Sequence, residues 1–388
     1  MGKTVFILGA GFSIEAGAPP QGKLIRNIIE LSSDNSDGYN GELMKFIDLL
    51  EKTFLLKPSQ FSDVPLEDIF TPLDRCIADN ISFRNLDVNQ VRVERERIAY
   101  LIGRTLQIIL EAPESIERDK NYIRKFAEYL VYFSSKRADG KYKEYDPVAV
   151  ISTNWDILLD DAIMDNLVGK RAVVDYCCPI SSYMAQDDKV MPGLEMLGKG
   201  GFNVKLIKLH GSLNWLQCPC CLRVYVDFYN KIAVNQYIQG ETCPHCDKNF
   251  GVSNSHRLIS NITMPTFLKN FSNTQYKLIW QNAAIELSEA SNIVFIGYSL
   301  PFADFELRQL LARMIREDAK IEVVDAMTCK PELFTDLKKR YQTFFGKREI
   351  IFYDKGARDY IQKNINIPPD AGVEKLVEIV KKNSQHRN

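Results

Sequence analysis

The stretch that most constrains the fold is VFILGAGFS, in which the apolar run Val5–Leu8 leads directly into Gly9-Ala10-Gly11. A short buried strand followed by a glycine turn is how a parallel α/β sheet begins a nucleotide site. A dinucleotide-binding dehydrogenase would place a third glycine three residues after the second, but Ile14 stands there and the next glycine is Gly17. The sequence therefore predicts a nucleotide site that starts like a Rossmann fold and then departs from its fingerprint.

The strand pattern returns after residue 146, where apolar runs rich in β-branched and aromatic residues alternate with helical stretches. This alternation favours a parallel sheet with helices on both faces. We predict an α/β fold with a Rossmann-like, doubly wound, mainly parallel sheet whose strands cover residues 4–8, 148–152, 202–212, 291–300, 320–326 and 348–354. The chain 1–388 is expected to form a single domain that ends in a helix and tail, 366–388.

Residues 43–145 follow a different pattern, because apolar residues recur there at steps of three and four, as in amphipathic helices. We predict a helical insertion within the sheet domain. The apolar positions of PLEDIFTPLDRCI, residues 65–77, have two possible uses: they pack against the home sheet or against another subunit. The second use predicts a homo-oligomer whose contacts come largely from the insertion.

The bulk composition excludes several classes of protein. Lys and Arg total 49 and Asp and Glu total 50, so no global basic field favours nucleic acid, and direct nucleic-acid binding is not expected. No stretch approaches the ~18–20 apolar residues of a membrane helix, and the N-terminal run does not resemble a signal peptide. We expect a cytoplasmic protein whose nine cysteines are free thiols or metal ligands.

Four predicted strands end in residues suited to a nucleotide site. Parallel strands bring their carboxyl ends to one edge of the sheet, so these ends should converge. Each cluster alone has a plainer interpretation: a glycine turn, a helix cap, or a structural histidine. The four clusters are Gly9-Ala10-Gly11-Phe12-Ser13, Thr153-Asn154-Trp155-Asp156, His210-Gly211-Ser212 and Gly297-Tyr298-Ser299-Leu300.

These clusters resemble the motifs of sirtuins and stand in the same order. GAGFSIEAGAP resembles the sirtuin pattern Gly-Ala-Gly-x-Ser followed by Gly-x-Pro, and STNWD resembles Thr-Gln-Asn-Ile-Asp at Asn154 and Asp156. KLHGSLN is similar to the His-Gly element and FIGYSL to the Gly-Thr-Ser-Leu element. Asp325 stands where sirtuins usually have an asparagine that faces the adenosine ribose.

The resemblance implies an NAD+ site with three catalytic residues, Asn154, His210 and Asp156. Asn154 can hold a ribose hydroxyl or the attacking water, and His210 can accept a proton from either. Asp156 can orient the ribose or His210. The residues expected to bind NAD+ are Gly9, Ala10, Gly11, Ser13, Gly17, Gly297, Ser299 and Asp325.

Two C-P-x-C turns, Cys218/Cys221 and Cys243/Cys246, lie about twenty residues apart. Paired turns of this kind suit a structural zinc held by four thiolates, which predicts a zinc-ribbon-like module at 213–252. Cys220 competes with Cys221 as a ligand, and free thiols or a redox pair are the alternatives. Sirtuins carry a zinc module at this point of the chain, so this prediction extends the resemblance.

Departures from the family pattern decide between activities. Protein-deacylating sirtuins follow Gly-x-Pro with Asp-Phe-Arg, whereas this chain has Pro20-Gln21-Gly22. That difference and the large insertion resemble the sirtuin-like NAD+ hydrolases of bacterial anti-phage defence. The alternatives are an NAD-dependent deacylase and a non-catalytic module that senses NAD+ or ADP-ribose. By family analogy, the partner of such an effector is a HerA-type DNA-translocating ATPase or an Argonaute-type protein.

Overall fold

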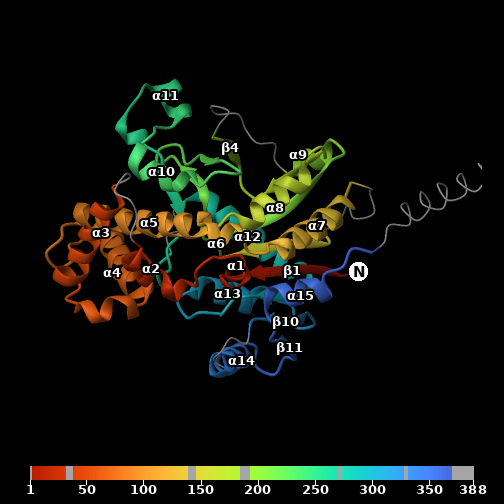
Figure 1. Cartoon of the computed structure of the whole chain (residues 1–388). Helices are drawn as coiled ribbons and strands as arrows, with labels where there is room; N and C mark the ends of the chain where they lie inside the picture. The colour runs from red at the N-terminus through yellow and green to blue at the C-terminus, as the bar shows by residue number, and fades with distance from the viewer. Residues whose placement is uncertain are drawn as a thin grey trace, which may run out of the picture.

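The structure is a computed structural model that describes residues 2–31, 38–138, 146–183, 193–269, 273–326 and 331–368. Figure 1 shows a central sheet, with the helices α2–α5 gathered to one side of it and α10 and α11 beside them. The predicted C-terminal helix and tail lie outside the described residues from residue 369 onward. None of the helices in the described ranges is both long and apolar enough to cross a membrane.

The main sheet has seven strands in the order β11-β10-β9-β1-β2-β5-β3, and every neighbouring pair is parallel. The predicted doubly wound α/β fold is therefore confirmed. The strands are β1 (Lys3–Leu8), β2 (Val148–Ser152), β3 (Ala172–Asp175), β5 (Phe202–Lys208), β9 (Ala290–Ile296), β10 (Lys320–Val324) and β11 (Ile350–Tyr353).

Helices cover both faces of this sheet. Phe6 packs edge-on against Phe126, whereas Phe295, which pairs in register with Ile7, packs against Tyr341. Because successive side chains point to opposite faces of a sheet, the helices of Phe126 and Tyr341 lie on opposite faces. These and the other helices around the sheet are α7 (Asn121–Ser135), α8 (Leu158–Leu167), α9 (Gly193–Gly198), α12 (Thr274–Glu289), α13 (Phe305–Met314), α14 (Pro331–Phe345) and α15 (Gly356–Asn364).

A second, smaller sheet has the order β4-β7-β6-β8. The segment predicted as one strand at 202–212 ends at Lys208, turns at Leu209 and His210, and continues into the second sheet as β6. The strands are β4 (Ile180–Ser182), β6 (Gly211–Gln217), β7 (Val224–Val226) and β8 (Ile259–Ile262), and they pack with α10 (Ile232–Gln239) and α11 (Pro244–Phe250). The limits 213–252 for the module stay a prediction.

Helices α2–α5 share a core that is separate from the core of the main sheet. Helix α2 precedes the predicted insertion, 43–145, and α7, which lies within those limits, packs on the main sheet instead. The apolar positions of α4 recur at Leu66, Ile69, Phe70 and Leu73, and all four side chains are buried against α2, α3 and α5. The buried positions of residues 65–77 thus pack on neighbouring helices and not on the main sheet, whereas packing of this segment on another subunit stays a prediction. The helices that share this core are α2 (Leu24–Glu30), α3 (Tyr39–Asp48), α4 (Leu66–Asp79) and α5 (Val88–Glu111), and the short α6 (Pro113–Ile116) follows them.

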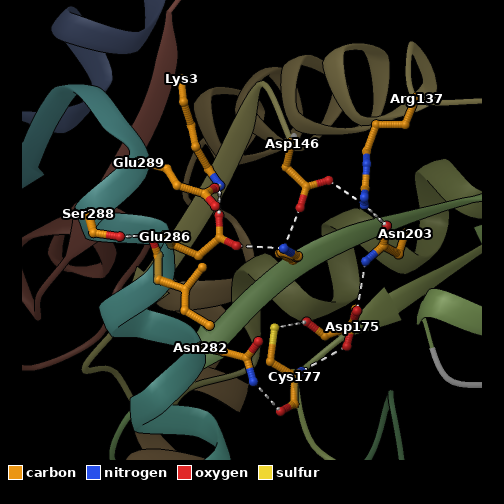
Figure 2. A network of polar contacts seen from close by, with 12 residues as sticks. Lys3, Arg137, Asp146, Asp175, Cys177, Asn203, Asn282, Glu286, Ser288 and Glu289 are labelled. Atoms are coloured by element: carbon orange, nitrogen blue, oxygen red, sulfur yellow. Dashed lines mark hydrogen bonds and ion pairs between the residues drawn. The ribbon is translucent and has the colours of Figure 1, made fainter. Parts of the chain in front are cut away.

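A buried charge network joins the segments at the amino edge of the sheet (Figure 2). Lys3 lies 2.5 Å from Glu286 and 2.6 Å from Glu289, so the start of β1 is tied to the end of α12. Glu286 also pairs with Lys205 of β5 at 2.5 Å, and Lys205 contacts Asp146, just before β2. Burial works against charge on Lys205, but Glu286 and Asp146 outweigh it and raise its pKa. The network extends through Arg137, Asn203 and Asp175.

At the opposite edge, the turns after β1 and β9 touch along their backbones. The Gly11 amide donates to the Gly297 carbonyl at 2.9 Å. A Cβ atom on Gly11 would lie 2.5 Å from Gly297 Cα, and one on Gly297 would lie 2.2 Å from the Phe12 nitrogen. Gly297 also has φ +62°, which L side chains rarely adopt. Glycine is required at both positions because the two turns pack together.

We expect Gly297→Ala to lower the free energy of unfolding by at least about 2 kcal/mol, since both the contact and the φ value oppose a side chain. Urea denaturation measures this. Gly41→Ala is the matched control, because Gly41 lies within α3 and a Cβ atom added there would meet no other atom within 4 Å. That substitution should be neutral or stabilising. A Gly297→Ala protein as stable as the parent would contradict the role of this contact.

Candidate functional site

A cavity of about 290 Å³ opens where the carboxyl ends of β1, β2, β5 and β9 meet. Helix α2 and the helices α4 and α5 of the predicted insertion close it on one side, through Leu24, Glu67 and Leu106. Most of the predicted site residues line this one cavity: Ala10, Gly11, Asn154, Asp156, His210, Gly297, Ser299 and Asp325.

The other predicted site residues, Gly9, Ser13 and Gly17, lie behind the cavity wall. Gly9 and Ser13 hold Asn154, whose amide nitrogen donates to the Gly9 carbonyl at 2.9 Å and to the Ser13 hydroxyl at 3.3 Å. Gly17 has φ +108° and packs against Ser115. The structure thus brings together the predicted catalytic residues and separates Gly17 from them.

The turn after β1 is more self-contained than a phosphate-binding loop. The helix α1 (Gly11–Ile14) is a single turn, and the amides of Gly9, Gly11, Phe12 and Ser13 donate to carbonyls within the chain. These four amides are therefore already committed. The case for a ligand at this turn rests on the position of Ala10 and Gly11 against the cavity.

The side-chain oxygen of Asn154 is the atom that can accept a hydrogen bond from a ligand. Its nitrogen is committed to Gly9 and Ser13, and its backbone amide donates to the Ser152 hydroxyl at 3.1 Å. An amide held in this way is fixed in orientation. The oxygen can then accept a hydrogen bond from a ligand hydroxyl or from water.

Asp156 combines a structural contact with a place in the cavity wall. Its carboxylate accepts the Leu158 amide at 3.2 Å at the start of α8, which is the capping role that was one alternative for this residue. Its carbonyl accepts from Lys208 at 2.7 Å. Burial raises the pKa of the Asp156 carboxyl, although Lys208 and Ser13 oppose the shift.

His210 is buried and neutral near pH 7. Burial, and after it the positive charge of Lys269, lowers the pKa of His210 to about 4, against the opposite effect of Asp304. Its Nε2 atom lies 3.3 Å from Asp304 Oδ1. A neutral imidazole has one nitrogen free to accept a proton, so His210 can act as a base, but its lowered pKa makes it a weaker base than an exposed histidine.

Ser299 and Asp325 lie on neighbouring strand ends, after β9 and β10. Ser299 is exposed at the cavity, and the Asp325 carboxylate accepts the Ala326 amide at 2.7 Å. Burial raises the pKa of the Asp325 carboxyl. Both residues can meet a ligand that extends from the turn after β1 toward β10.

Sequence reasoning missed three charged residues at this site. Asp304 lines the cavity at the start of α13, Lys269 contacts Asp304 at 2.7 Å, and Glu67 reaches the cavity from α4. Burial raises the pKa of Glu67, whose carboxylate accepts from Gln21 at 3.1 Å. None of the three follows a strand directly, so the pattern that identified the other residues gave no signal for them.

The four predicted zinc ligands lie together beside the second sheet, in the turn after β6 and at the start of α11. The sulfur atoms of Cys218, Cys221, Cys243 and Cys246 are all within 4.8 Å of one another. Two of the sulfur–sulfur separations are 3.7 Å, for Cys218–Cys246, and 3.8 Å, for Cys221–Cys243. A tetrahedral zinc with Zn–S bonds of about 2.3 Å places its sulfurs about 3.8 Å apart, so the residues fit this metal. Cys220 is exposed and bonds the Ser255 carbonyl instead.

No family model and no curated protein matches the chain. Solved sirtuin structures match it over most of its length at low identity. One, described as "The Structural basis of Sirtuin Substrate Affinity", shares 15% identity over 93% of this chain and 92% of that chain, with a TM-score of 0.41. Sir2Tm bound to a propionylated peptide shares 14% over 93% and 91%, with a TM-score of 0.36. A Sir2–p53 peptide–NAD+ structure shares 14% over 93% and 91%, with a TM-score of 0.34. At these TM-scores the matches support no conclusion about this chain, and its architecture rests on its own strand order.

Proposed function

We propose that this protein hydrolyses NAD+ at the nicotinamide–ribose bond. The observation that carries the proposal is the convergence of Asn154, Asp156 and His210 on one cavity beside the glycine turn after β1. In the reaction, the bond from ribose C1′ to the nicotinamide nitrogen breaks and its electron pair leaves with nicotinamide. The oxygen of water bonds to C1′, and one proton of that water is released. The products are ADP-ribose and nicotinamide.

The chain's own residues supply the parts that this reaction needs. The Asn154 oxygen accepts a hydrogen bond from the ribose or the water, and neutral His210 accepts the proton. Positive charge develops on the ribose ring as the bond breaks. Carboxyl groups of Glu67, Asp156, Asp304 and Asp325 line the same cavity. The pKa of Asp304 is held below its usual range, so this group favours positive charge nearby, whereas burial raises the pKa of the other three.

NAD+ would extend along the strand ends, with its phosphates and riboses near Ala10, Gly11, Gly297, Ser299 and Asp325. Gly9, Ser13 and Gly17 support that surface from behind. The runner-up is an NAD-dependent deacylase, and a non-catalytic module that senses NAD+ or ADP-ribose is a third candidate.

The segment after the glycine turn favours hydrolysis over deacylation. Pro20, Gln21 and Gly22, which stand where deacylases carry Asp-Phe-Arg, line the cavity, and Gln21 is hydrogen-bonded to Glu67 of the insertion. The residues that a deacylase uses to handle nicotinamide and the acyl intermediate are thus replaced. A cavity closed in this way suits water as the acceptor.

Purified protein incubated with NAD+ alone should release nicotinamide and ADP-ribose in equal amounts, measured by chromatography. Asn154→Ala and His210→Ala should each lower the rate at least about a hundredfold, the scale of general-base loss. Asn364→Ala is the matched control, because Asn364 is exposed at the end of α15. Turnover that requires an acyl-lysine peptide would support the deacylase, and binding without turnover would support the sensor.

Within a cell, we assign this activity to a cytoplasmic effector of anti-phage defence that acts by abortive infection. The assignment rests on the sequence resemblance. A partner encoded separately, such as a HerA-type ATPase, would control it. Assembly is a second means of control, and the insertion carries exposed apolar side chains, among them Met44, Leu55, Ile81 and Val93.

Light scattering at micromolar concentration should therefore find a homo-oligomer whose NAD+ hydrolysis depends on assembly through residues 43–145. Exposed apolar side chains on α3 and α5 are the surfaces expected to be covered. A strict monomer with full hydrolysis and no partner present would contradict this prediction.

The four-cysteine cluster is assigned to a structural zinc. Cys218, Cys243 and Cys246 are buried in a small core with Leu216, Tyr225, Ile232, Ala233 and Leu258. Four protein ligands leave no open position for a substrate. A metal at this point would tie β6 to α11 and stabilise that core.

Elemental analysis should find one zinc per chain, and a chelator should lower the melting temperature because metal binding is coupled to folding of such a module. Cys221→Ser should lose zinc, whereas Cys220→Ser is the matched control and should retain it. Protein purified without zinc, or the reverse order of the two variants, would contradict the ligand set.

A further inference from the structure

Nε2 of His210 is a buried polar atom without a hydrogen-bond partner among the described residues. Asp304 Oδ1 is 3.3 Å away, yet the two atoms do not form a hydrogen bond. The backbone of Thr153 has a smaller effect on the ring, and it favours the protonated form. Buried atoms of this kind are rare, and this one faces a carboxylate oxygen.

Asp304 is itself held in place and ionised. Lys269 lies 2.7 Å from its Oδ1, and the Tyr298 hydroxyl donates to its Oδ2 at 3.0 Å. Burial opposes the charge, but His210, Lys269 and Tyr298 outweigh it and hold the pKa of Asp304 below its usual range. Asp304 is therefore ionised and lies close enough to stabilise a positive charge on the His210 ring.

The charged and titratable groups around His210 come from several elements. Asp304 and Glu306 begin α13, Lys269 precedes α12, Tyr298 follows β9, and Glu67 of α4 acts on Asp304. Lys269 and Asp304 exert opposite electrostatic effects on the His210 ring. Both are nearly fully buried, so solvent screens these effects little.

We propose that Asp304 and Lys269 are a positioning pair that sets the proton affinity of His210. When His210 takes a proton from a ribose hydroxyl or water, the charged ring is paired with the Asp304 carboxylate, whose Oδ1 lies 3.3 Å from Nε2. The electron pair of the broken O–H bond stays on the oxygen. Lys269 keeps Asp304 ionised, so that the proton remains on the imidazole. The inference rests on the proposed function, in which His210 is the base.

The direct test follows the His210 ring by NMR titration of the histidine side chains, with His210→Gln to assign its signal. Lys269→Met should raise the pKa of His210 by about one unit, because a neighbouring positive charge is removed. Asp304→Asn should lower it, so that the ring stays neutral to the lowest pH at which the protein is folded. Asp359→Asn, which breaks an exposed pair with Lys363 on α15, is the control and should leave His210 unchanged.

Removing one partner of a buried ion pair leaves the other charge uncompensated, so the double variant Asp304→Asn/Lys269→Met is included. It lacks both opposing charges, and His210 should titrate between the two single variants. Shifts in the same direction in both single variants, or no shift beyond the control, would overturn the proposal.

Kinetics separate this role from a structural one. The acid limb of kcat/KM against pH should move up in Lys269→Met, and Asp304→Asn should lower kcat at least about tenfold with KM for NAD+ little changed. A purely structural pair would lower thermal stability without moving the limb. If no variant and no parent hydrolyses NAD+, the proposed function fails while the NMR titration still decides the coupling. If the variants hydrolyse NAD+ but neither the acid limb of kcat/KM nor the pKa of His210 changes, the proposal about Asp304 and Lys269 is wrong and the proposed function stands.

Discussion

The backbone contact between the turns after β1 and β9 fixes the geometry on which the site depends. Gly11 and Gly297 approach so closely that neither tolerates a Cβ atom. The Gly9 carbonyl, just before that contact, orients Asn154, and Asp304 follows the turn of Gly297 within the same loop toward α13. The orientation of the Asn154 amide and the placement of the group that faces His210 therefore both depend on two glycines at the centre of the sheet.

The sequence predicts the sheet well because its signal is local. Each apolar run that ends in a polar turn is visible within ten residues, and the carboxyl ends of β1, β2, β5 and β9 meet as expected. The short strands β3, β4 and β8 carry too few residues to show a period. The core shared by α2–α5 was also missed, because apolar periodicity reports that a helix has a buried face but not what covers it.

The charged residues of the site could not be predicted either, because the sequence does not show which distant residues meet after folding. Lys269 and Asp304 are 35 residues apart and meet His210 from two different loops. Nothing in a single sequence distinguishes them from the many surface Lys and Asp residues until folding buries them together. The choice between Cys220 and Cys221 likewise could not be made from the spacing. It depends on the backbone conformation after Cys218, which directs Cys221 toward the other three sulfurs and Cys220 toward the Ser255 carbonyl.

The central position of β1 has a consequence for how the protein is made. β1 is synthesised before its partners β2 and β9, and Lys3 is synthesised before Glu286 and Glu289, with which it pairs. At ribosomal speeds of about 5–20 residues per second, roughly 15 to 60 seconds pass before residue 290 appears. The helices α2–α5 bury one another through nearer contacts and can form during that interval. During that interval the nascent chain exposes the side of β1 on which β9 will pair, and an unpaired apolar strand is the kind of segment that chaperones shield.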